Sequence, residues 1–438
     1  MKVTIKNIGK IKEAEIDLDK QLTVFFGPNN TGKTYISYCI YGLFDHTFIL
    51  EFLNKGFKFE IDETVIKEKK VELNFDKDIL PQRERVLKSF IEIKQKYFKS
   101  EFGNYLIKFN DSEFYPSFLK DDISFKHHFE KIKDVNLGQG VSVKKQNNLI
   151  TVSTFGGGED LDKEIIEKRI SSNLNAFLNS WLFQTIILYH TISHFITAER
   201  IGISLFGKEL GAKRLEQANI PQNRDEIISY PKAINDGLIN TIKFRPVSFS
   251  IYSMISDFIE NDILKGKLIL DESGDVYFSD DEIKNLPLLN TASTIKSLSS
   301  LVLYLRYYCM KGDTLIIDEP EINLHPENQV KVARVLAKLS NIGVKVIVST
   351  HSDYIIREFN NLIMLGSSDK NGKELMDKFG YFEEEILCYK NIGVYNFDDG
   401  HSKSVKITNE GFDTDSIDEV INSQNKASNE IRFKLIEN

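Results

Sequence analysis

The 438-residue sequence predicts an α/β fold, and three features carry that prediction. The apolar run LTVFF at residues 22–26 leads into a glycine-rich loop and then into an amphipathic helix expected from Tyr35 to Phe44. Two mainly apolar runs, TLII at 314–317 and VKVIVS at 344–349, have the composition of strands buried on both faces. Alternating apolar and polar residues over 1–18 predict an antiparallel β-layer ahead of the loop.

The loop after the first of these buried runs has the composition of a phosphate-binding loop. Residues 27–34 read GPNNTGKT and fit the spacing G-x-x-x-x-G-K-[ST], in which backbone N–H groups surround phosphate oxygens at a helix N-terminus. Lys33 is expected to reach the β- and γ-phosphates of ATP, and the Thr34 hydroxyl to be a ligand of Mg²⁺. An ordinary Gly/Asn turn is the alternative, which the flanking strand and helix disfavour. The candidate ATP-binding residues are Gly27, Asn29, Asn30, Thr31, Gly32, Lys33, Thr34 and Tyr35.

Two adjacent acids follow the strand at 314–317. Asp318 is expected to hold Mg²⁺, directly or through water, and Glu319 to act as the general base for the water that attacks the γ-phosphate. Two charges at a buried strand end are unfavourable without a cation, which argues against a purely structural pair.

A histidine, His351, follows the other buried run in the stretch VIVSTHSDYII. Neighbouring parallel strands present their carboxyl ends at one edge of the sheet, where α/β folds bind ligands. His351 is therefore expected to sense or position the γ-phosphate, with a structural role as the alternative. Glu319, His351 and Lys33 are the catalytic candidates.

The composition predicts a globular cytoplasmic protein. It is 41% hydrophobic and 27% charged, has no apolar run near the ~20 residues that cross a bilayer, and begins without a signal-peptide pattern. Cys39, Cys309 and Cys388 lack metal-ligand spacing and fit packing roles in a reducing compartment. The net charge of −8 argues against a globally basic nucleic-acid binder, and the lack of a long apolar run argues against a membrane partner.

One basic stretch keeps a local nucleic-acid face open. Between Lys67 and Lys108, lysines and arginines alternate with aromatic residues that include Phe90 and Phe98. A solvated helix surface is the more usual meaning of such a pattern.

The segment before the second half of the ATPase core offers two weaker candidates. A core helix is expected from Asn173 to His194, and His190 and His194 are four residues apart, but no H-E-x-x-H pattern accompanies them, so packing is favoured over metal binding. Arg200 follows a short predicted strand in HFITAER and is expected to contact phosphate or a partner.

Four segments are expected along the chain. Residues 1–44 form the N-terminal lobe with the loop, 45–195 a mainly helical insertion for dimerisation or partner binding, 196–365 the rest of the ATPase core, and 366–438 a C-terminal α/β extension. No sustained heptad repeat occurs in the insertion, which excludes long coiled-coil arms.

Four motifs together resemble the ABC-type ATPase heads shared by chromosome-maintenance (SMC-like), double-strand-break-repair and OLD-family proteins, and most of all the compact bacterial members of the AAA_15 type. They are GPNNTGKT, TASTIKSLSSL, TLIIDEPEINLHP and VIVSTHSDYII. The resemblance implies that Asp318 and Glu319 are the Walker B acids, that residues 321–325 form the D-loop and that His351 is the switch histidine. It also implies a head-to-tail dimer, possibly within a higher oligomer, in which the signature helix of one copy faces the phosphate loop of the other.

The signature is where this chain departs from the resemblance. Compact relatives have Ser-Ser-Gly where Ala292, Ser293 and Thr294 stand here. Ser293 and the helix N-terminus are still expected to hold the partner's γ-phosphate in trans. The missing glycine predicts slow turnover, because a side chain adds bulk where backbones approach closely. A plain Ser/Thr-capped helix is the alternative.

The resemblance also implies a biological role. Compact ATPases of this kind are subunits of anti-phage systems such as PARIS and Septu, in which the ATPase restrains or senses for a separate effector, a nuclease or toxin. OLD-family nucleases append a metal-dependent nuclease domain, for which the residues after Leu365 leave no room, and Asp398 and Asp399 fit an ordinary turn. The alternative function is a DNA-repair ATPase that clamps DNA in its ATP-bound dimer.

Overall fold

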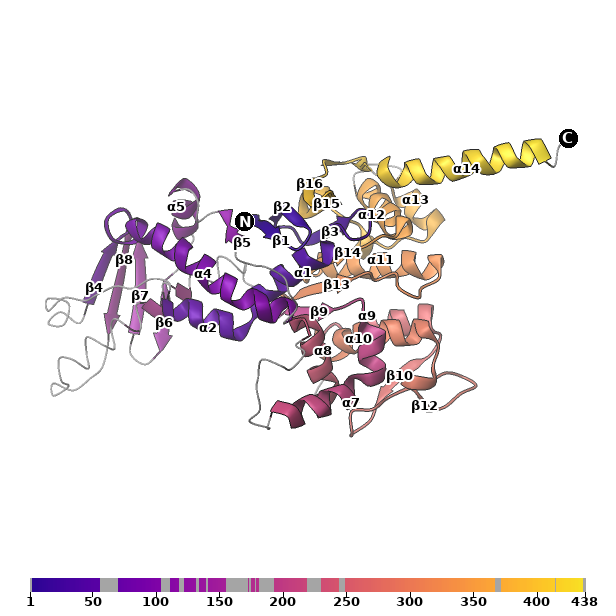
Figure 1. Cartoon of the computed structure of the whole chain (residues 1–438), viewed down its shortest axis with the longest axis horizontal. Coiled ribbons are helices and arrows are strands. Elements are labelled where there is room, and N and C mark those ends of the chain that lie inside the picture. Colours follow the sequence, from indigo (N-terminus) through magenta and orange to yellow (C-terminus); the bar gives the residue numbers. More distant parts are fainter. Residues whose placement is uncertain are drawn as a thin grey trace. The chain divides into compact units, whose positions relative to one another are not determined.

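The structure is a computed structural model of the whole chain (Figure 1). It describes residues 2–55, 70–103, 111–117, 122–130, 134–138, 141–154, 172, 175–177, 179–180, 193–218, 230–243, 249–366, 372–413 and 415–435. The chain divides into two compact units, the first made of residues 1–19 and 38–191 and the second of residues 20–37 and 192–438.

In the described part of the first unit, the strands β5, β1 and β2 are antiparallel neighbours in that order, and a second set of antiparallel strands has the order β4-β8-β7-β6. Its elements are β1 (Lys2–Ile8), β2 (Ile11–Asp17), η1 (Gly42–Phe44), α2 (His46–Lys55), β4 (Lys70–Asn74), η2 (Phe75–Ile79), η3 (Leu80–Gln82), α4 (Arg83–Phe102), β5 (Glu113–Pro116), α5 (Asp122–Glu130), β6 (Val135–Gly138), β7 (Val141–Gln146) and β8 (Leu149–Thr154).

The β-layer predicted at the N-terminus is present, because β1 and β2 pair antiparallel with their apolar residues buried. The segment 45–195 contains the expected helices α2, α4 and α5, but it also contains the β4-β8-β7-β6 sheet, so a mainly helical description is incomplete. Of the four strands, only the LITVSTF run was evident as a strand from its sequence, and it corresponds to β8.

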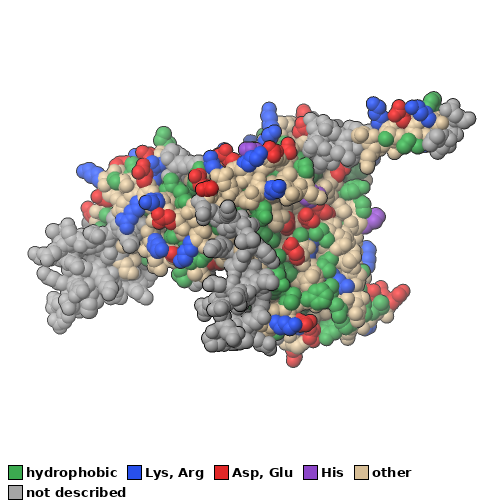
Figure 2. All heavy atoms as spheres, viewed as in Figure 1, with side chains coloured by type: hydrophobic (Ala, Val, Ile, Leu, Met, Phe, Trp, Pro, Cys, Tyr) green, Lys and Arg blue, Asp and Glu red, His purple; other side chains and the backbone are tan. Residues whose placement is uncertain are grey.

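Several residues of the basic stretch between Lys67 and Lys108 belong to the core of the first unit. Phe90 and Phe98 on α4 are fully buried, so neither can stack on a nucleic-acid base. Lys94 is buried as well and forms an ion pair with Glu101 within a group of aromatic rings. Lys67, Tyr105 and Lys108 lie outside the described residues. On the face shown in Figure 2, basic and acidic side chains are interspersed over the described residues.

The second unit contains a mainly parallel sheet with the strand order β16-β15-β3-β14-β13-β9. Its elements are β3 (Leu22–Phe26), α1 (Lys33–Tyr41), β9 (Ser193–Ile196), α7 (Arg200–Ala218), α8 (Lys232–Lys243), α9 (Ser253–Phe258), η5 (Ile259–Leu264), β10 (Lys267–Leu270), β11 (Val276–Ser279), β12 (Leu286–Pro287), η6 (Leu288–Asn290), α10 (Ser293–Tyr307), β13 (Thr314–Asp318), α11 (Pro326–Asn341), β14 (Lys345–Ser349), α12 (Asp353–Leu365), α13 (Gly372–Phe379), η7 (Glu383–Glu385), η8 (Tyr389–Asn391), β15 (Ile392–Asp398), β16 (His401–Ser404), β17 (Ile407–Thr408), β18 (Gly411–Phe412) and α14 (Asp415–Leu435).

Strands β13 and β14 are buried at every residue, as their apolar sequences predict. In Figure 1, β3, β14 and β13 lie side by side, and α11 packs beside them against β14. The amphipathic helices α10, α11 and α12 contribute most of their buried apolar residues to one core with these strands. The fold is therefore mixed α/β, as the sequence predicts.

The strand register aligns the ends of the central strands. Phe25 of β3 is paired with Ser349 of β14, and Ser349 is paired with Asp318 of β13. Since these strands are parallel, the segments that follow them leave the sheet at the same edge. This register brings the loop after β3, the acids of β13 and the histidine after β14 to one place.

The C-terminal extension takes part in the same sheet. Strand β15 pairs in parallel with β3, and β16 forms a hairpin with β15. The predicted turn at Asp398 and Asp399 is the turn of this hairpin, and the extension ends in the helix α14. The strand that completes the sheet beside the phosphate loop thus comes from more than 360 residues along the chain, at residues 392–398.

The expected core helix from Asn173 to His194 lies largely outside the described residues, as does His190. Its last residue belongs to a strand instead, since His194 is in β9. The His194 ring packs against Tyr304 and Tyr308, with ring centroids 4.5 and 5.5 Å apart, which fits the packing role. Among the helices that the structure describes, none combines the length and apolar character needed to span a membrane.

Candidate nucleotide site

The phosphate loop joins β3 to α1 through two glycines with positive φ. Gly27 has φ of 129° and Gly32 has φ of 100°, values that side-chain-bearing residues rarely adopt. Asn29 and Asn30 are exposed, while Thr31 is buried and its hydroxyl donates to the Pro28 carbonyl at 2.9 Å. The loop is thus held by its own backbone and leaves its tip open to solvent.

Gly27 is also confined by the C-terminal extension. A methyl group in place of its hydrogen would overlap the carbonyl oxygen of Phe397 on β15. The side-chain oxygen of Asn396, on the same strand, is buried beside Gly27 and has no hydrogen-bond partner among the described residues. This contact could not be predicted, because strand pairing between distant segments leaves no local pattern in the sequence.

Gly27→Ala is expected to lower the free energy of unfolding by about 1–3 kcal/mol, the usual effect of overpacking in a tight site. Urea unfolding measures this effect. Gly380→Ala is the matched control, since Gly380 also has positive φ (69°) but has open space around it. Equal destabilisation by the two variants would mean that the close approach to Phe397 is unimportant.

Lys33, at the start of α1, is folded back on the loop. It is 5% exposed, and its ammonium group donates to the carbonyls of Gly27 and Pro28 at 3.0 and 2.8 Å. Burial lowers the pKa of Lys33 to about 8, against the opposing effect of Asp318, Glu319 and Glu321. Its ammonium group also donates to the Thr31 hydroxyl at 3.5 Å, so Lys33 is a buried cation that is hydrogen-bonded to neutral oxygens and lies in the field of three acids.

Asp318 lies beside two hydroxyl groups at the end of β13. Thr34 Oγ1 donates to Asp318 Oδ2 at 2.9 Å, and Ser349 Oγ donates to Asp318 Oδ1. Asp318 is 3% exposed, and burial raises its pKa to about 6 although both hydroxyls act in the opposite direction. This carboxyl group is suited to a cation, because a positive ion would relieve the unfavourable burial of its charge. Ser349 was not among the sequence candidates, and its only signal was its place as the last residue of β14.

Asp318→Asn is expected to stabilise the nucleotide-free protein at pH 7.5 by about 1–3 kcal/mol, since each pKa unit corresponds to about 1.4 kcal/mol. The folded-state pKa is above the ordinary value of 3.8, so ionisation of Asp318 becomes a cost as the pH rises through about 6. The gain should be much smaller at pH 4, because the carboxyl group of folded wild type is then neutral like the amide. Thermal unfolding at the two pH values tests this, and an Asn variant less stable than wild type at pH 7.5 would contradict it.

Glu319 and His351 face each other across the ends of β13 and β14. Glu319 has φ of 47°, and its N–H donates to the Ser349 carbonyl at 2.9 Å. Its Oε1 is 3.7 Å from His351 Nε2, with the two side chains 35% and 29% exposed. Burial, and then the Lys33 charge, lower the pKa of His351 to about 4. The imidazole is therefore neutral at pH 7, and the carboxyl group of Glu319 is partly exposed, so that water can reach it.

Glu321 connects the acids to the histidine segment. Its Oε1 accepts hydrogen bonds from the Thr350 hydroxyl at 2.9 Å and from the His351 N–H at 2.6 Å. Burial raises its pKa, against the effect of these hydrogen bonds. The sequence placed Glu321 in the D-loop but did not indicate this contact, which ties the D-loop to the switch histidine.

Arg200 begins α7 and is 2% exposed. Its guanidinium donates to the carbonyls of Asp318 and Glu319 at 2.9 and 2.8 Å, and to Ser297 on α10 at 3.0 Å. These donors are directed to groups of the same chain, and the phosphate or partner contact of Arg200 stays a prediction. Arg200 instead fixes the backbone that carries both acids.

The signature helix α10 is attached to the D-loop. Thr294 Oγ1 donates to the Asn323 carbonyl at 3.0 Å, and Ser297 Oγ to the Ile322 carbonyl at 2.8 Å. Ser293, at the first position of the helix, is exposed, and the N-cap residue Ala292 makes no side-chain capping bond. The alternative of a simply capped helix is therefore not supported, and the first N–H groups remain available to an outside anion.

No cluster of three or more His, Cys, Asp or Glu side chains suited to a metal occurs among the described residues. Thr34 and Asp318 would have to hold Mg²⁺ together with nucleotide oxygens and water, which is how Mg²⁺ is usually bound at phosphate sites. Cys39 and Cys309 are buried and Cys388 is exposed, and none lies among these residues.

The model of the family described as AAA ATPase domain (AAA_15) matches residues 1–356. The chain belongs to this family. It is accordingly a nucleotide-binding ATPase domain, and the matched region contains every residue of the site described above except those of β15.

A search of solved structures finds three SMC head structures at low similarity. The SmcHead bound to the C-winged helix domain of ScpA has 14% identity and a TM-score of 0.34, over 92% of this chain and 96% of that one. The SMC head domain from Thermotoga maritima has 12% identity and a TM-score of 0.32, over 93% and 98%. The Smc head domain with an extended coiled coil bound to the C-terminal domain of ScpA, from Pyrococcus furiosus, has 13% identity and a TM-score of 0.31, over 98% of both chains. A comparison with curated proteins finds no match.

Proposed function

We propose that the chain hydrolyses ATP in a Mg²⁺-dependent reaction. The observation that supports this most is the convergence of Lys33, Asp318 and His351 at the aligned ends of β3, β13 and β14. Thr34 and Asp318 would hold Mg²⁺, which would supply positive charge against the negative charge that develops on the phosphate oxygens.

Residues of the chain would bind the phosphates, hold the metal ion and accept the proton of the attacking water. Lys33 exchanges the carbonyls of Gly27 and Pro28 for phosphate oxygens, which is favourable because a buried ammonium gains charged partners. Thr34 and Asp318 hold the metal ion. Glu319, whose carboxyl group is partly exposed, accepts a proton from water, while neutral His351 can donate one ring N–H to a phosphate oxygen.

The test is phosphate release from ATP by the purified chain in Mg²⁺ and, as a control, in EDTA. Turnover in Mg²⁺ that is lost in EDTA is the expected result, and slow turnover agrees with the altered signature. Retention of ATP in the purified protein without any phosphate release would favour a nucleotide-bound scaffold over an enzyme.

The exposed start of α10 supports a further part of the proposal, a head-to-tail pair of copies. Ser293 and the uncapped N–H groups of α10 lie outside the hydrogen-bonding scheme that holds Lys33 and Asp318. A second copy would present this helix end to the phosphates, so that each site is made by two chains.

Control of a separate nuclease or toxin in phage defence is the role that we propose for this ATPase. It rests on the family resemblance of the motifs and on the net charge of −8, which disfavours DNA as the main ligand. A DNA-clamping repair function instead predicts DNA binding that weakens steeply with salt. Binding of a DNA duplex measured with and without ATP between 50 and 200 mM salt, a range over which several phosphate contacts change affinity by about 10³-fold or more, separates the two.

A further inference from the structure

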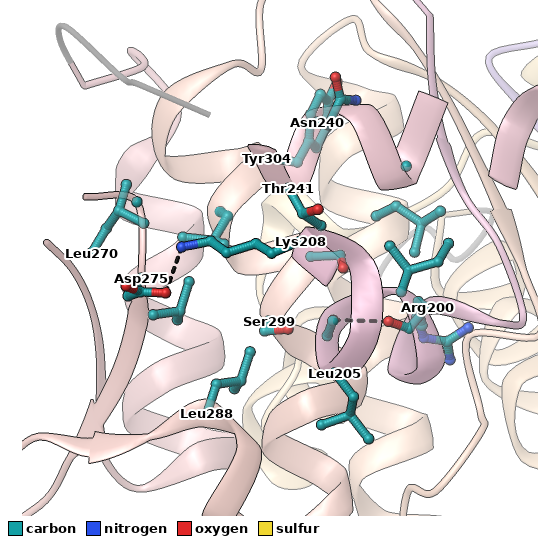
Figure 3. Close-up of a pocket in the computed structure, with 18 of the residues that line it drawn as sticks. Arg200, Leu205, Lys208, Asn240, Thr241, Leu270, Asp275, Leu288, Ser299 and Tyr304 are labelled. Carbon is teal, nitrogen blue, oxygen red and sulfur yellow. Dashed lines mark hydrogen bonds and ion pairs between the residues drawn. The ribbon is translucent and has the colours of Figure 1, made fainter. Parts of the chain in front are cut away.

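A cavity of about 580 Å³ lies in the second unit between α7, α8, α10 and the strands β9 to β12 (Figure 3). Pockets for drug-sized ligands have volumes of roughly 300–1,000 Å³, so this one is of a suitable size. Figure 3 shows Leu205, Leu288 and Tyr304 around it, together with Lys208, whose side chain extends to Asp275. None of the nucleotide-site residues other than Arg200 lines this cavity.

Arg200 connects the cavity to the nucleotide site. It lines the cavity, and its guanidinium holds the carbonyls of Asp318 and Glu319 at 2.9 and 2.8 Å. The α10 residues Ser299 and Leu303 line the cavity too, and the same helix donates from Ser297 to the D-loop carbonyl of Ile322. A molecule bound between α7 and α10 would therefore contact the helix whose Arg200 holds the backbone of the acids and the signature helix itself.

The charged groups of the lining favour an uncharged occupant. Lys208 and Asp275 form an ion pair with each other, and Arg200 is hydrogen-bonded to carbonyl groups. Burial lowers the pKa of His194 to about 4, so its ring is neutral at pH 7. A charged ligand would find its possible partners already engaged, and its desolvation would be unfavourable.

The aromatic groups of the lining favour a flat occupant. His194 and Tyr304 have ring centroids 4.5 Å apart, and Tyr308 adds a third ring 5.5 Å from His194. Such rings pack well on other aromatic rings in offset or edge-on arrangements.

We propose that this cavity binds a neutral, largely aromatic small molecule, and that the bound molecule changes ATP turnover through Arg200. The regulatory half of this inference rests on the proposed ATPase function, whereas the binding half does not.

The experiment titrates the neutral dye N-phenyl-1-naphthylamine into the full chain and follows its fluorescence. Ser204→Phe, on the α7 wall, and Ser300→Phe, on the α10 wall, fill the cavity from two sides, so that misfolding of one variant leaves a second test. Lys213→Phe is the matched control, because Lys213 is on α7 with a side chain 67% exposed and does not line the cavity. Circular dichroism and thermal unfolding confirm the fold of each variant.

Wild type and Lys213→Phe are expected to bind one dye per chain saturably, and the two filling variants to bind about tenfold more weakly or not at all, a change of about 1.4 kcal/mol or more. Equal binding by all four proteins, or no saturable binding by wild type, would overturn the inference.

A second measurement tests the coupling to Arg200. Saturating dye is expected to change ATP turnover by wild type. It is expected to leave ATP turnover by folded Ser204→Phe unchanged. Dye binding without any change in measurable wild-type turnover would overturn the regulatory half. Saturable dye binding to a chain that hydrolyses no ATP would instead count against the proposed function and support the cavity as a site.

Discussion

Exchange of Glu319 for glutamine is expected to lower ATP turnover by about 10²- to 10⁴-fold while ATP binding persists. A general base contributes a factor of this size, and an amide cannot accept the proton of the attacking water. Glutamine keeps the shape of the side chain, and the backbone contacts of this residue with Ser349 and Arg200 do not involve the carboxylate.

Phosphate release and ATP affinity measured on the same preparations test this expectation. Glu374→Gln on α13 is the matched control, because Glu374 is exposed and lies in the first turn of a helix that contributes nothing to the site. Wild-type turnover in the Glu319 variant would remove this residue from catalysis and assign the proton to another acceptor.

Exchange of Lys33 for alanine is expected to weaken ATP binding by about 10- to 100-fold, since a hydrogen bond to a charged group contributes about 1.5–3 kcal/mol. The substitution also removes a buried cation whose pKa is lowered to about 8, so the nucleotide-free variant should unfold no more readily than wild type. Loss of binding with retained stability would separate a nucleotide-binding role from a structural one.

The same residue predicts a pH dependence. Because burial lowers the pKa of Lys33 to about 8, its ammonium loses its proton as the pH rises above that value, and phosphate binding requires the proton. ATP affinity should therefore fall between pH 7 and pH 9 in wild type and stay flat in Lys33→Ala. Isothermal titration calorimetry at the two pH values measures the ATP affinity. Lys373→Ala is the control, because Lys373 is an exposed residue of α13. An equal fall in the Lys33 variant would assign the titration to another group.

The central strands and the nucleotide residues were predictable because each is encoded locally. The glycines and the lysine of the phosphate loop all lie within the eight residues GPNNTGKT. Strands β13 and β14 are indicated by apolar runs that end in polar residues. Parallel pairing then brings their ends together without further information.

Features that depend on distant pairing were not predictable in this way. The confinement of Gly27 by Phe397 depends on β15 joining β3, and neither sequence hints at the other. Short strands such as β4 and β7 were not predicted, because they lie in a segment whose sequence pattern is mainly helical. Arg200 was noticed for its place after a strand, but its role depends on which carbonyls lie opposite, and only the fold determines that.

A mixing experiment tests most directly the claim that two copies complete one site. Lys33→Ala lacks the phosphate-loop cation, and Ser293→Glu places a negative charge where the partner's phosphates are expected, while acids are well tolerated at a helix N-terminus. Each variant alone should be nearly inactive. In an equal mixture, about half of the pairs contain both variants and hold one intact site, so turnover should rise to about a quarter of the wild-type value. A mixture no more active than the separate variants would contradict the shared site.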